Sequence, residues 1–480
     1  MFSWSQFVQV WNAFFFAPEP VATLCVCRIL LGLLVIVDGC LHWQFRKIFI
    51  SPDGVFSAAA FQKVYGKARF TVFNLLPETQ RSVDWVLGLY ILSGLLTALG
   101  VATPYCFVMS WLLVTSLHHR GICFMNAGDA LLRIMLFLMC FSYAGAGLSV
   151  DAWLAGRGVV ESLWTSAPPW CLRLMQIQLA LLYFRAVAFK MQGPAWRNGT
   201  AVLYAISNKN YQMWSIPQWL QTRGGIAIAT YFTLIVEWSF AVLIWIRELR
   251  PALIIIGLLL HLGMEITLNL QLFSWLMMIC LLLFVDPQFT LGIAEWLAWI
   301  THHQQAVILD GSVSYIVVNT FIALYVFYAY IWNAPDNTVL KPLVALIRPA
   351  VKYWGLWHSW SMFAPTLFSV TRSVELQVHF EDGEVLVWKP EFHSGMSRLQ
   401  RFRHERFRKM GENCREGEFE YVRWCLCEYV IRQMRREHGN DRKIKQVTLY
   451  HVDEPMADFN TTLESDLSIR RNLHYTYTVK

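Results

Sequence analysis

The chain has 480 residues, of which 56% are hydrophobic, 15% aromatic and only 15% charged. A soluble domain is usually about 25% charged, so this composition excludes an ordinary soluble protein and predicts a multi-pass membrane protein. The net charge is +7, and the basic residues gather in the loop 42–83 and after residue 340. Such clusters suit lipid headgroups better than nucleic acid. We expect the lipid bilayer, and no nucleic acid, as a partner.

The first 20 residues are rich in aromatic side chains and end in prolines. They predict an amphipathic helix in the membrane interface rather than a cleavable signal peptide. Long apolar runs then recur, and because a helix of roughly 20 apolar residues crosses a bilayer, we expect about eight to nine spanning helices. The clearest runs lie at about 21–41, 84–102, 104–118, 125–147, 170–190, 226–246, 251–285 and 313–332.

The tail has a different pattern. Residues 373–380 and 384–390 alternate apolar and polar side chains around Glu381-Asp382-Gly383, which predicts a β-hairpin. A charged helical stretch follows at about 395–437, and another strand at 444–452. The fold class is therefore mainly α, a helical membrane bundle with a small C-terminal α+β domain. We divide the chain into an interfacial helix (1–20), a transmembrane domain (21–335) and a membrane-associated domain (336–480).

Several charged residues lie inside the apolar runs. Arg28 and Asp38 are ten residues apart, roughly 15 Å along a helix, so they cannot pair directly. Asp129 and Arg133 are spaced i, i+4, and could bond each other on one helical face. A lone charge facing lipid costs several kcal/mol. We therefore expect these groups at helix ends or inside the bundle.

Histidine and cysteine give weak metal signals. His118 and His119 are adjacent and would point in different directions on a helix, so a metal ion shared by both is improbable. We interpret them as a wet helix end, that is, the end of a helix in contact with water. The eleven cysteines are scattered. Cys425 and Cys427 lack the spacing of a redox pair. We expect no metal site and no functional disulfide.

The stretch Tyr183 to Trp196, YFRAVAFKMQGPAW, closes one of the apolar runs. It contains Lys190, and Gly193 and Pro194 stop the helix just after it. A lysine at such a place either extends to the lipid headgroups or is buried for chemistry. Position alone favours the first of these interpretations.

His261, Glu265 and Asn269 recur at i, i+4 and i+8 within the run 251–285, which would place them along one helical face. Three polar groups at membrane depth must face protein or a wet cavity, and we expect a functional cavity. Each of them alone could be a satisfied hydrogen bond between helices. The run is long enough for one tilted helix, or for two helices with a bend near 269–271.

The order of these segments resembles a known family. RILLGLLVIVD at 28–38 and DWVLGLYILSGLLTALG resemble the first spanning helices of the vitamin K-dependent gamma-glutamyl carboxylases. They also resemble the bacterial relatives of these enzymes, the horizontally transferred transmembrane (HTTM) family. YFRAVAFKMQGPAW is similar to the segment with the essential basic lysine, and HLGMEITLNLQLF to the helix with a histidine near the quinone pocket. WSMFAP and the strand-rich tail are similar to bacterial members.

The resemblance implies an enzyme that oxidises a reduced quinone, of the vitamin K or menaquinone type, with oxygen and uses the reaction to abstract a proton from a weak carbon acid. It implies Lys190, in its neutral form, and His261 as catalytic residues. It also implies six residues around the quinone, namely Asn126, Asp129, Arg133, Trp196, Glu265 and Asn269.

One position departs from the carboxylases: the histidine that follows their matching asparagine is replaced here by Gly128. The resemblance therefore implies the fold of the carboxylases more strongly than it implies their carboxylation step. The resemblance further implies a bacterial cytoplasmic membrane and a possible protein or peptide substrate. Two other functions remain open: a non-enzymatic membrane scaffold that works through its tail, and a transporter of lipids or small molecules whose path the polar stripe would line. Membrane orientation and oligomeric state stay open.

Overall fold

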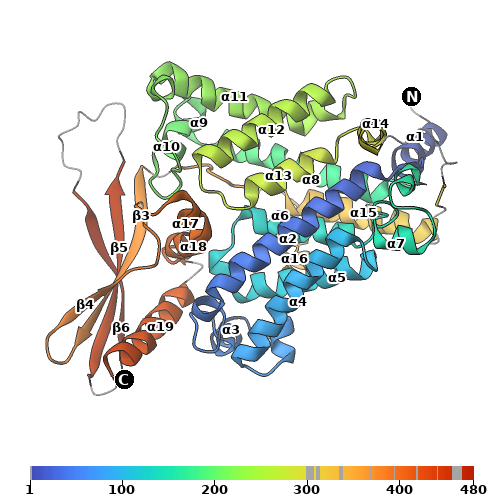
Figure 1. Cartoon of the computed structure of the whole chain (residues 1–480). Helices are drawn as coiled ribbons and strands as arrows, with labels where there is room; N and C mark the ends of the chain where they lie inside the picture. Colours follow the sequence, from blue (N-terminus) through green and yellow to red (C-terminus); the bar gives the residue numbers. More distant parts are fainter. Residues whose placement is uncertain are drawn as a thin grey trace.

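The computed structural model describes residues 3–298, 307–309, 314–334, 339–367, 369–393, 395–417, 420–439, 442–456 and 468–479. Figure 1 shows a helical bundle with a sheet-containing domain at one end. The fold is mainly α, as the sequence predicts. The long bundle helices are α1 (Trp4–Phe16), α2 (Ala22–Phe49), α4 (Gln80–Leu99), α5 (Thr103–Arg120), α6 (Ala127–Met139), α8 (Trp170–Lys190), α11 (Arg223–Val242), α12 (Arg250–Thr267), α13 (Phe273–Leu282), α14 (Pro287–Ala298), α15 (Tyr315–Trp332) and α16 (Lys341–Tyr353).

Short elements connect these helices at the two ends of the bundle. They are the helices α3 (Ala58–Tyr65), α7 (Val150–Leu154), α9 (Pro194–Arg197) and α10 (Ala201–Ser207), and a two-stranded antiparallel sheet of β1 (Glu19–Pro20) and β2 (Ser166–Ala167).

Six of the described helices are long and apolar enough to cross a membrane, and α13 with α14, bent by 94°, would make a seventh. This is fewer than the eight to nine that the apolar runs predict. Two predicted spans account for the difference: α6 has only 13 residues, and the last turn of α5 consists of His118, His119 and Arg120. These three residues are buried, so the prediction of a wet helix end was wrong.

The run 251–285 folds as two helices rather than one. The helix α12 ends at Thr267 and α13 begins at Phe273. Between them Gln271 has a φ of 52°, a left-handed conformation that a helix cannot contain. The break turns the chain near the predicted bend, and it moves Asn269 off the helix that carries His261.

The C-terminal domain is an antiparallel sheet with helices on one side. The strand order is β4-β3-β5-β6, and the strands are β3 (Val370–Phe380), β4 (Val385–Trp388), β5 (Ile444–Pro455) and β6 (Arg470–Thr478). The hairpin β3–β4 and the strand β5 confirm the sequence prediction. The edge strand β6 was missed because its residues RRNLHYTYT are mostly polar and exposed. The charged stretch forms α17 (Arg398–Arg403), α18 (Glu405–Asn413) and α19 (Glu420–His438).

The helices α17 and α18 lie between the sheet and the bundle (Figure 1). They join the two parts through buried polar contacts. Arg401 donates to the backbone oxygens of Lys209 and Gln212, and Asn413 donates to the oxygen of Cys123 at 2.7 Å. The C-terminal domain is therefore packed on the bundle, and its predicted association with the membrane stays a prediction.

Candidate functional site

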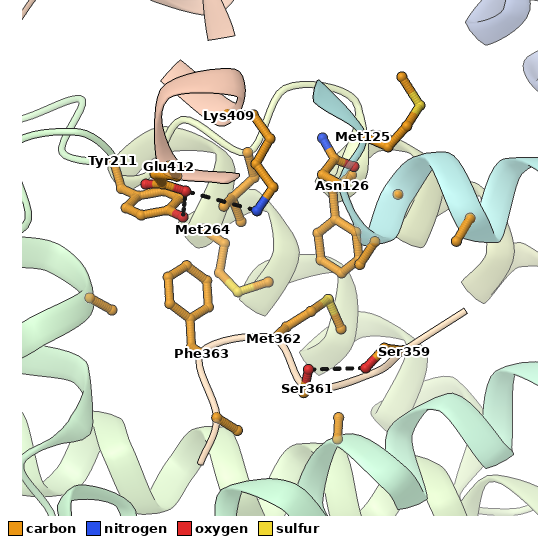
Figure 2. Close-up of a pocket in the computed structure, with 18 of the residues that line it drawn as sticks. Met125, Asn126, Tyr211, Met264, Ser359, Ser361, Met362, Phe363, Lys409 and Glu412 are labelled. Atoms are coloured by element: carbon orange, nitrogen blue, oxygen red, sulfur yellow. Dashed lines mark hydrogen bonds and ion pairs between the residues drawn. The ribbon is translucent and has the colours of Figure 1, made fainter. Parts of the chain in front are cut away.

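A cavity of about 560 Å³ lies where the bundle meets the C-terminal domain. Its walls come from α6, α8, α11 and α12, from the segment 357–367 and from α18. Figure 2 shows Met264, Met362 and Phe363 around one part of the cavity and Lys409, Glu412 and Asn126 around another. The cavity therefore combines an apolar region within the bundle with a charged region at the C-terminal domain.

Lys190 lies at the bundle end of the cavity. Its side chain is buried, its Nζ forms an ion pair with Glu237 of α11, and Nζ lies 4.8 Å from the centre of the Trp196 ring. Both contacts stabilise a positive charge on the amine. Lys190 therefore does not extend to the lipid headgroups. Its partner, Glu237, also lines the cavity and was not among the predicted site residues.

The turn after α8 packs against the segment 357–367, which lines the cavity. A Cβ atom on Gly193 would lie 1.9 Å from the backbone oxygen of Pro365, so only glycine allows the segment 357–367 to cross here. The Nε1 of Trp196 donates to the oxygen of Phe363 at 2.8 Å and fixes that segment. The predicted helix stop at Gly193 and Pro194 thus holds the segment 357–367, which forms one wall of the cavity.

His261 also lines the cavity and is 3% exposed. Its Nε2 lies 2.8 Å from the hydroxyl of Tyr183, whose ring stacks on Phe240. In the part of the chain that the structure describes, the His261 Nδ1 and the Glu237 Oε2 have no hydrogen-bond partner, although both are buried. Buried polar atoms usually have partners, and the cavity is where a ligand could supply them.

The predicted stripe of three polar residues does not form. Because α12 ends at Thr267, Asn269 turns away and donates to the backbone oxygen of Arg401 at 2.9 Å. Glu265 accepts a hydrogen bond from Trp275 Nε1 at 2.9 Å. Of the three residues, only His261 reaches the cavity. The hydrogen bond that fixes His261 comes from Tyr183 and not from Glu265.

A second polar centre lies beside the cavity. Arg406 of α18 is buried and binds Asp129 through two hydrogen bonds, of 2.5 Å and 2.7 Å, and Asp38 through one of 3.2 Å. Asp129 also accepts from the backbone nitrogen of Asn126 at 2.6 Å, and the Asn126 side chain caps α6 in return. Asn126 lines the cavity, whereas Asp129 lies behind it.

The predicted pair of Asp129 and Arg133 was wrong. Asp129 is bound by Arg406. Arg133 instead donates to the Gly355 oxygen at 2.7 Å and contacts His118 Nδ1 at 2.9 Å. The expectation that Arg28 does not pair with Asp38 was right: Arg28 donates to the backbone oxygens of Ala144 and Leu148.

Asp38, His42 and His118 each place one possible metal ligand within 4.8 Å of the others. The hydrogen bonds around them do not suit a metal ion. Arg133 can only donate, so the His118 Nδ1 accepts from it. The proton of a neutral ring is then on Nε2, which lies 3.7 Å from Asp129 and 4.0 Å from Asp38. Arg406 already supplies a positive charge to Asp38. We therefore describe this group as a buried charge network and assign no metal to it.

The helix α18 supplies the wall of the cavity that faces the C-terminal domain. Glu405, Arg408, Lys409 and Glu412 line it. Burial alone would raise the pKa of Glu412, but the nearby Arg408 guanidinium lowers it, and the net shift is downward. Sequence reasoning missed this wall, because a run of alternating charges is typical of a solvated helix.

Comparison with protein families supports the resemblance to the HTTM family. The family model "HTTM domain" matches residues 16–289, which is more than half of the chain. No curated protein and no solved structure matches. The matched region contains Asn126, Lys190, Glu237 and His261 and ends before α15 and the C-terminal domain. The chain belongs to the HTTM domain family.

Proposed function

We propose that this protein is a membrane oxidoreductase that binds a reduced quinone of the vitamin K or menaquinone type and oxidises it with oxygen. The reaction would drive proton abstraction from a weak carbon acid, as in carboxylase- or epoxidase-like chemistry. The observation that carries the proposal is the pair of buried, unpartnered polar atoms, Glu237 Oε2 and His261 Nδ1, on the walls of one cavity.

The residues present fit a hydroquinone. The rest of the bundle end is apolar, with Leu182, Ala186, Met264 and Met277 among its lining residues, and suits a flat ring with a hydrocarbon tail. The two hydroxyl groups of a hydroquinone are hydrogen-bond donors that Glu237 Oε2 and His261 Nδ1 could accept. The fit rests on the donor and acceptor pattern of these side chains.

When bound, a reduced quinone would supply the electrons that reduce oxygen and, through that reaction, the driving force for removing a proton from a carbon acid. Glu237 accepts a proton at Oε2. Lys190 stabilises a negative charge that forms beside it, because its ammonium lies against Glu237 at the edge of the cavity. Tyr183 holds His261 in place. We therefore assign proton transfer to the Lys190–Glu237 pair rather than to an isolated neutral lysine.

We extend the proposal to a bacterial cytoplasmic membrane and to a protein or peptide as the carbon acid, on the basis of the carboxylase resemblance alone. A Cβ atom at Gly128 would lie 3.1 Å from the Phe273 Cα, a tight contact, so a histidine like that of the carboxylases would require the chain near Phe273 to shift. The proposal therefore ends at proton abstraction and does not include the addition of carbon dioxide.

The test is oxygen uptake by the purified protein supplied with menahydroquinone. The wild type should consume oxygen faster than the spontaneous oxidation, and Lys190→Ala and Glu237→Gln should lose most of this rate. The double variant Lys190→Met/Glu237→Gln removes both charges, so its inactivity could not be attributed to a lone buried charge. Lys209→Ala, at an exposed ion pair with Glu454, is the control.

If the wild type shows no such uptake with any quinone tried, the enzyme proposal fails. The scaffold alternative predicts a different pattern. Under that alternative, Lys190→Ala would leave the cellular phenotype intact and deletion of the C-terminal domain would remove it.

A further inference from the structure

We propose that the part of the cavity nearest the C-terminal domain binds an anionic group, a carboxylate or a phosphate, of a second reactant, and that Lys409 and Asn126 hold it. The proposal deepens the proposed function and rests on it for the identity of the cavity as a reaction site. The binding itself can be measured without any quinone.

Lys409 supplies the positive charge. It lies on α18, 24% of its side chain is exposed, and its amine extends into the cavity (Figure 2). Among the described residues, its ion-pair partner is Glu412, and the distance of 3.8 Å is too long for a hydrogen bond. Its three N–H donors are therefore free to bind a ligand.

Asn126 supplies a second donor from the opposite wall. Its side-chain oxygen caps α6 by accepting from the backbone nitrogen of Asp129 at 3.2 Å. This contact fixes the amide orientation and leaves the Nδ2 group on the cavity side (Figure 2). Within the described residues, Nδ2 has no hydrogen-bond partner. Lys409 and Asn126 thus present donors to one space from two separate elements.

The neighbouring carboxylates are ion-paired, although among the described residues the buried Glu405 Oε2 has no hydrogen-bond partner. Glu412 forms an ion pair with Arg408 at 2.6 Å through Oε1 and accepts from the Tyr211 hydroxyl at 3.1 Å through Oε2. Arg408 is in turn bound to Glu405 at 2.5 Å. Both oxygens of Glu412, the carboxylate nearest Lys409, are therefore engaged, whereas the donors of Lys409 and Asn126 are not. A ligand that fits must supply acceptors, and an anionic oxygen accepts most strongly from an ammonium group.

The experiment measures thermal stabilisation of the purified full-length protein by three probes at constant ionic strength: malonate, inorganic phosphate and dihexanoyl phosphatidic acid. The first two represent a water-soluble reactant, and the third represents a lipid headgroup. Two variants test the donors. Lys409→Gln removes the charge at similar length, and Asn126→Ser removes Nδ2 but keeps a residue that caps helices well. Lys209→Gln, outside the cavity, is the matched control.

We expect at least one probe to stabilise the wild type saturably. Its apparent Kd should rise about tenfold or more in Lys409→Gln and in Asn126→Ser, because each loses hydrogen bonds to a charged ligand, and should stay unchanged in Lys209→Gln. Stabilisation by phosphatidic acid alone would identify the anion as a lipid headgroup.

The site is refuted if no probe stabilises the wild type, or if Lys409→Gln binds as tightly as the wild type. Should Lys409→Gln not fold, the Asn126→Ser result decides in the same way. If the wild-type protein binds an anion but shows no quinone-dependent oxygen uptake, the proposed function is contradicted and the anion site is not.

Discussion

Arg406 is the residue whose removal should most weaken the junction between the bundle and the C-terminal domain. It is 3% exposed and makes three charge-assisted hydrogen bonds to Asp129 and Asp38. Replacing it by leucine leaves two buried carboxylates without their counter-charge. Removing one partner of a buried ion pair costs about 3–5 kcal/mol. Since the whole folding free energy of a protein is about 5–15 kcal/mol, Arg406→Leu should remove a large part of it.

Two further variants separate charge from geometry. Arg406→Lys keeps the charge but cannot form the two parallel bonds to Asp129, so we expect an intermediate loss. In the double variant Arg406→Leu/Asp129→Asn, part of the loss should be recovered, because one of the two unpaired charges is removed as well. Arg442→Leu is the control, since its ion pairs with Asp382 and Glu384 are on the surface and should contribute little.

The assay is thermal unfolding in detergent combined with maleimide labelling of Cys414, located by mass spectrometry. Cys414 is fully buried next to Asn413, which binds the bundle, so its labelling reports separation of the two parts. Arg406→Leu should label faster than the wild type at temperatures below global unfolding. If Arg406→Leu unfolds and labels like Arg442→Leu, then the buried network does not hold the two parts together.

The remaining predictions concern helix packing and pH. A Cβ atom on Gly32 would lie 2.5 Å from the Ala98 backbone nitrogen, so Gly32→Ala should lower stability by about 1–3 kcal/mol through overpacking. Gly88→Ala, where a Cβ meets nothing within 4 Å, should be neutral or slightly stabilising in thermal unfolding, and equal effects of the two variants would contradict this packing. Burial lowers the pKa of His451 from 6.5 to about 3, so the unfolded chain takes up the proton first and stability should fall as the pH drops from 6.5 towards 3. His451→Gln should reduce that pH dependence, and an unchanged slope in the variant would refute the assignment.

The sequence predicted those features that depend on local pattern. Lys190 was noticed because it interrupts an apolar run just before Gly193 and Pro194, although only the family resemblance gave it a catalytic role, and the structure places it at the cavity together with His261. The hairpin β3–β4 was identified by its alternation and its Glu381-Asp382-Gly383 turn. In both cases the signal lies within about a dozen neighbouring residues.

The features that sequence reasoning missed depend on contacts between distant segments. Glu237 was visible as a charge in an apolar run, but nothing in the sequence connected it to Lys190, 47 positions away. Arg406 is one basic residue in a stretch full of them, and only the fold brings it to Asp129, 277 positions away. The prediction that His261, Glu265 and Asn269 share one helical face was wrong because the helix ends at Thr267. Periodicity alone does not reveal such a break.

The position of α18 indicates which part of this protein determines the choice of the second reactant. Arg406 anchors the helix in the bundle, and Lys409, almost one turn later, faces the cavity. A chain with the same HTTM helices but another tail would keep Lys190, Glu237 and His261 and lose Lys409. If the bundle end carries the reaction with the quinone, then the C-terminal domain selects the second reactant. Changing Lys409 should therefore alter which anions bind while menahydroquinone oxidation in their absence continues, and a parallel loss of both would show that the two regions of the cavity do not work independently.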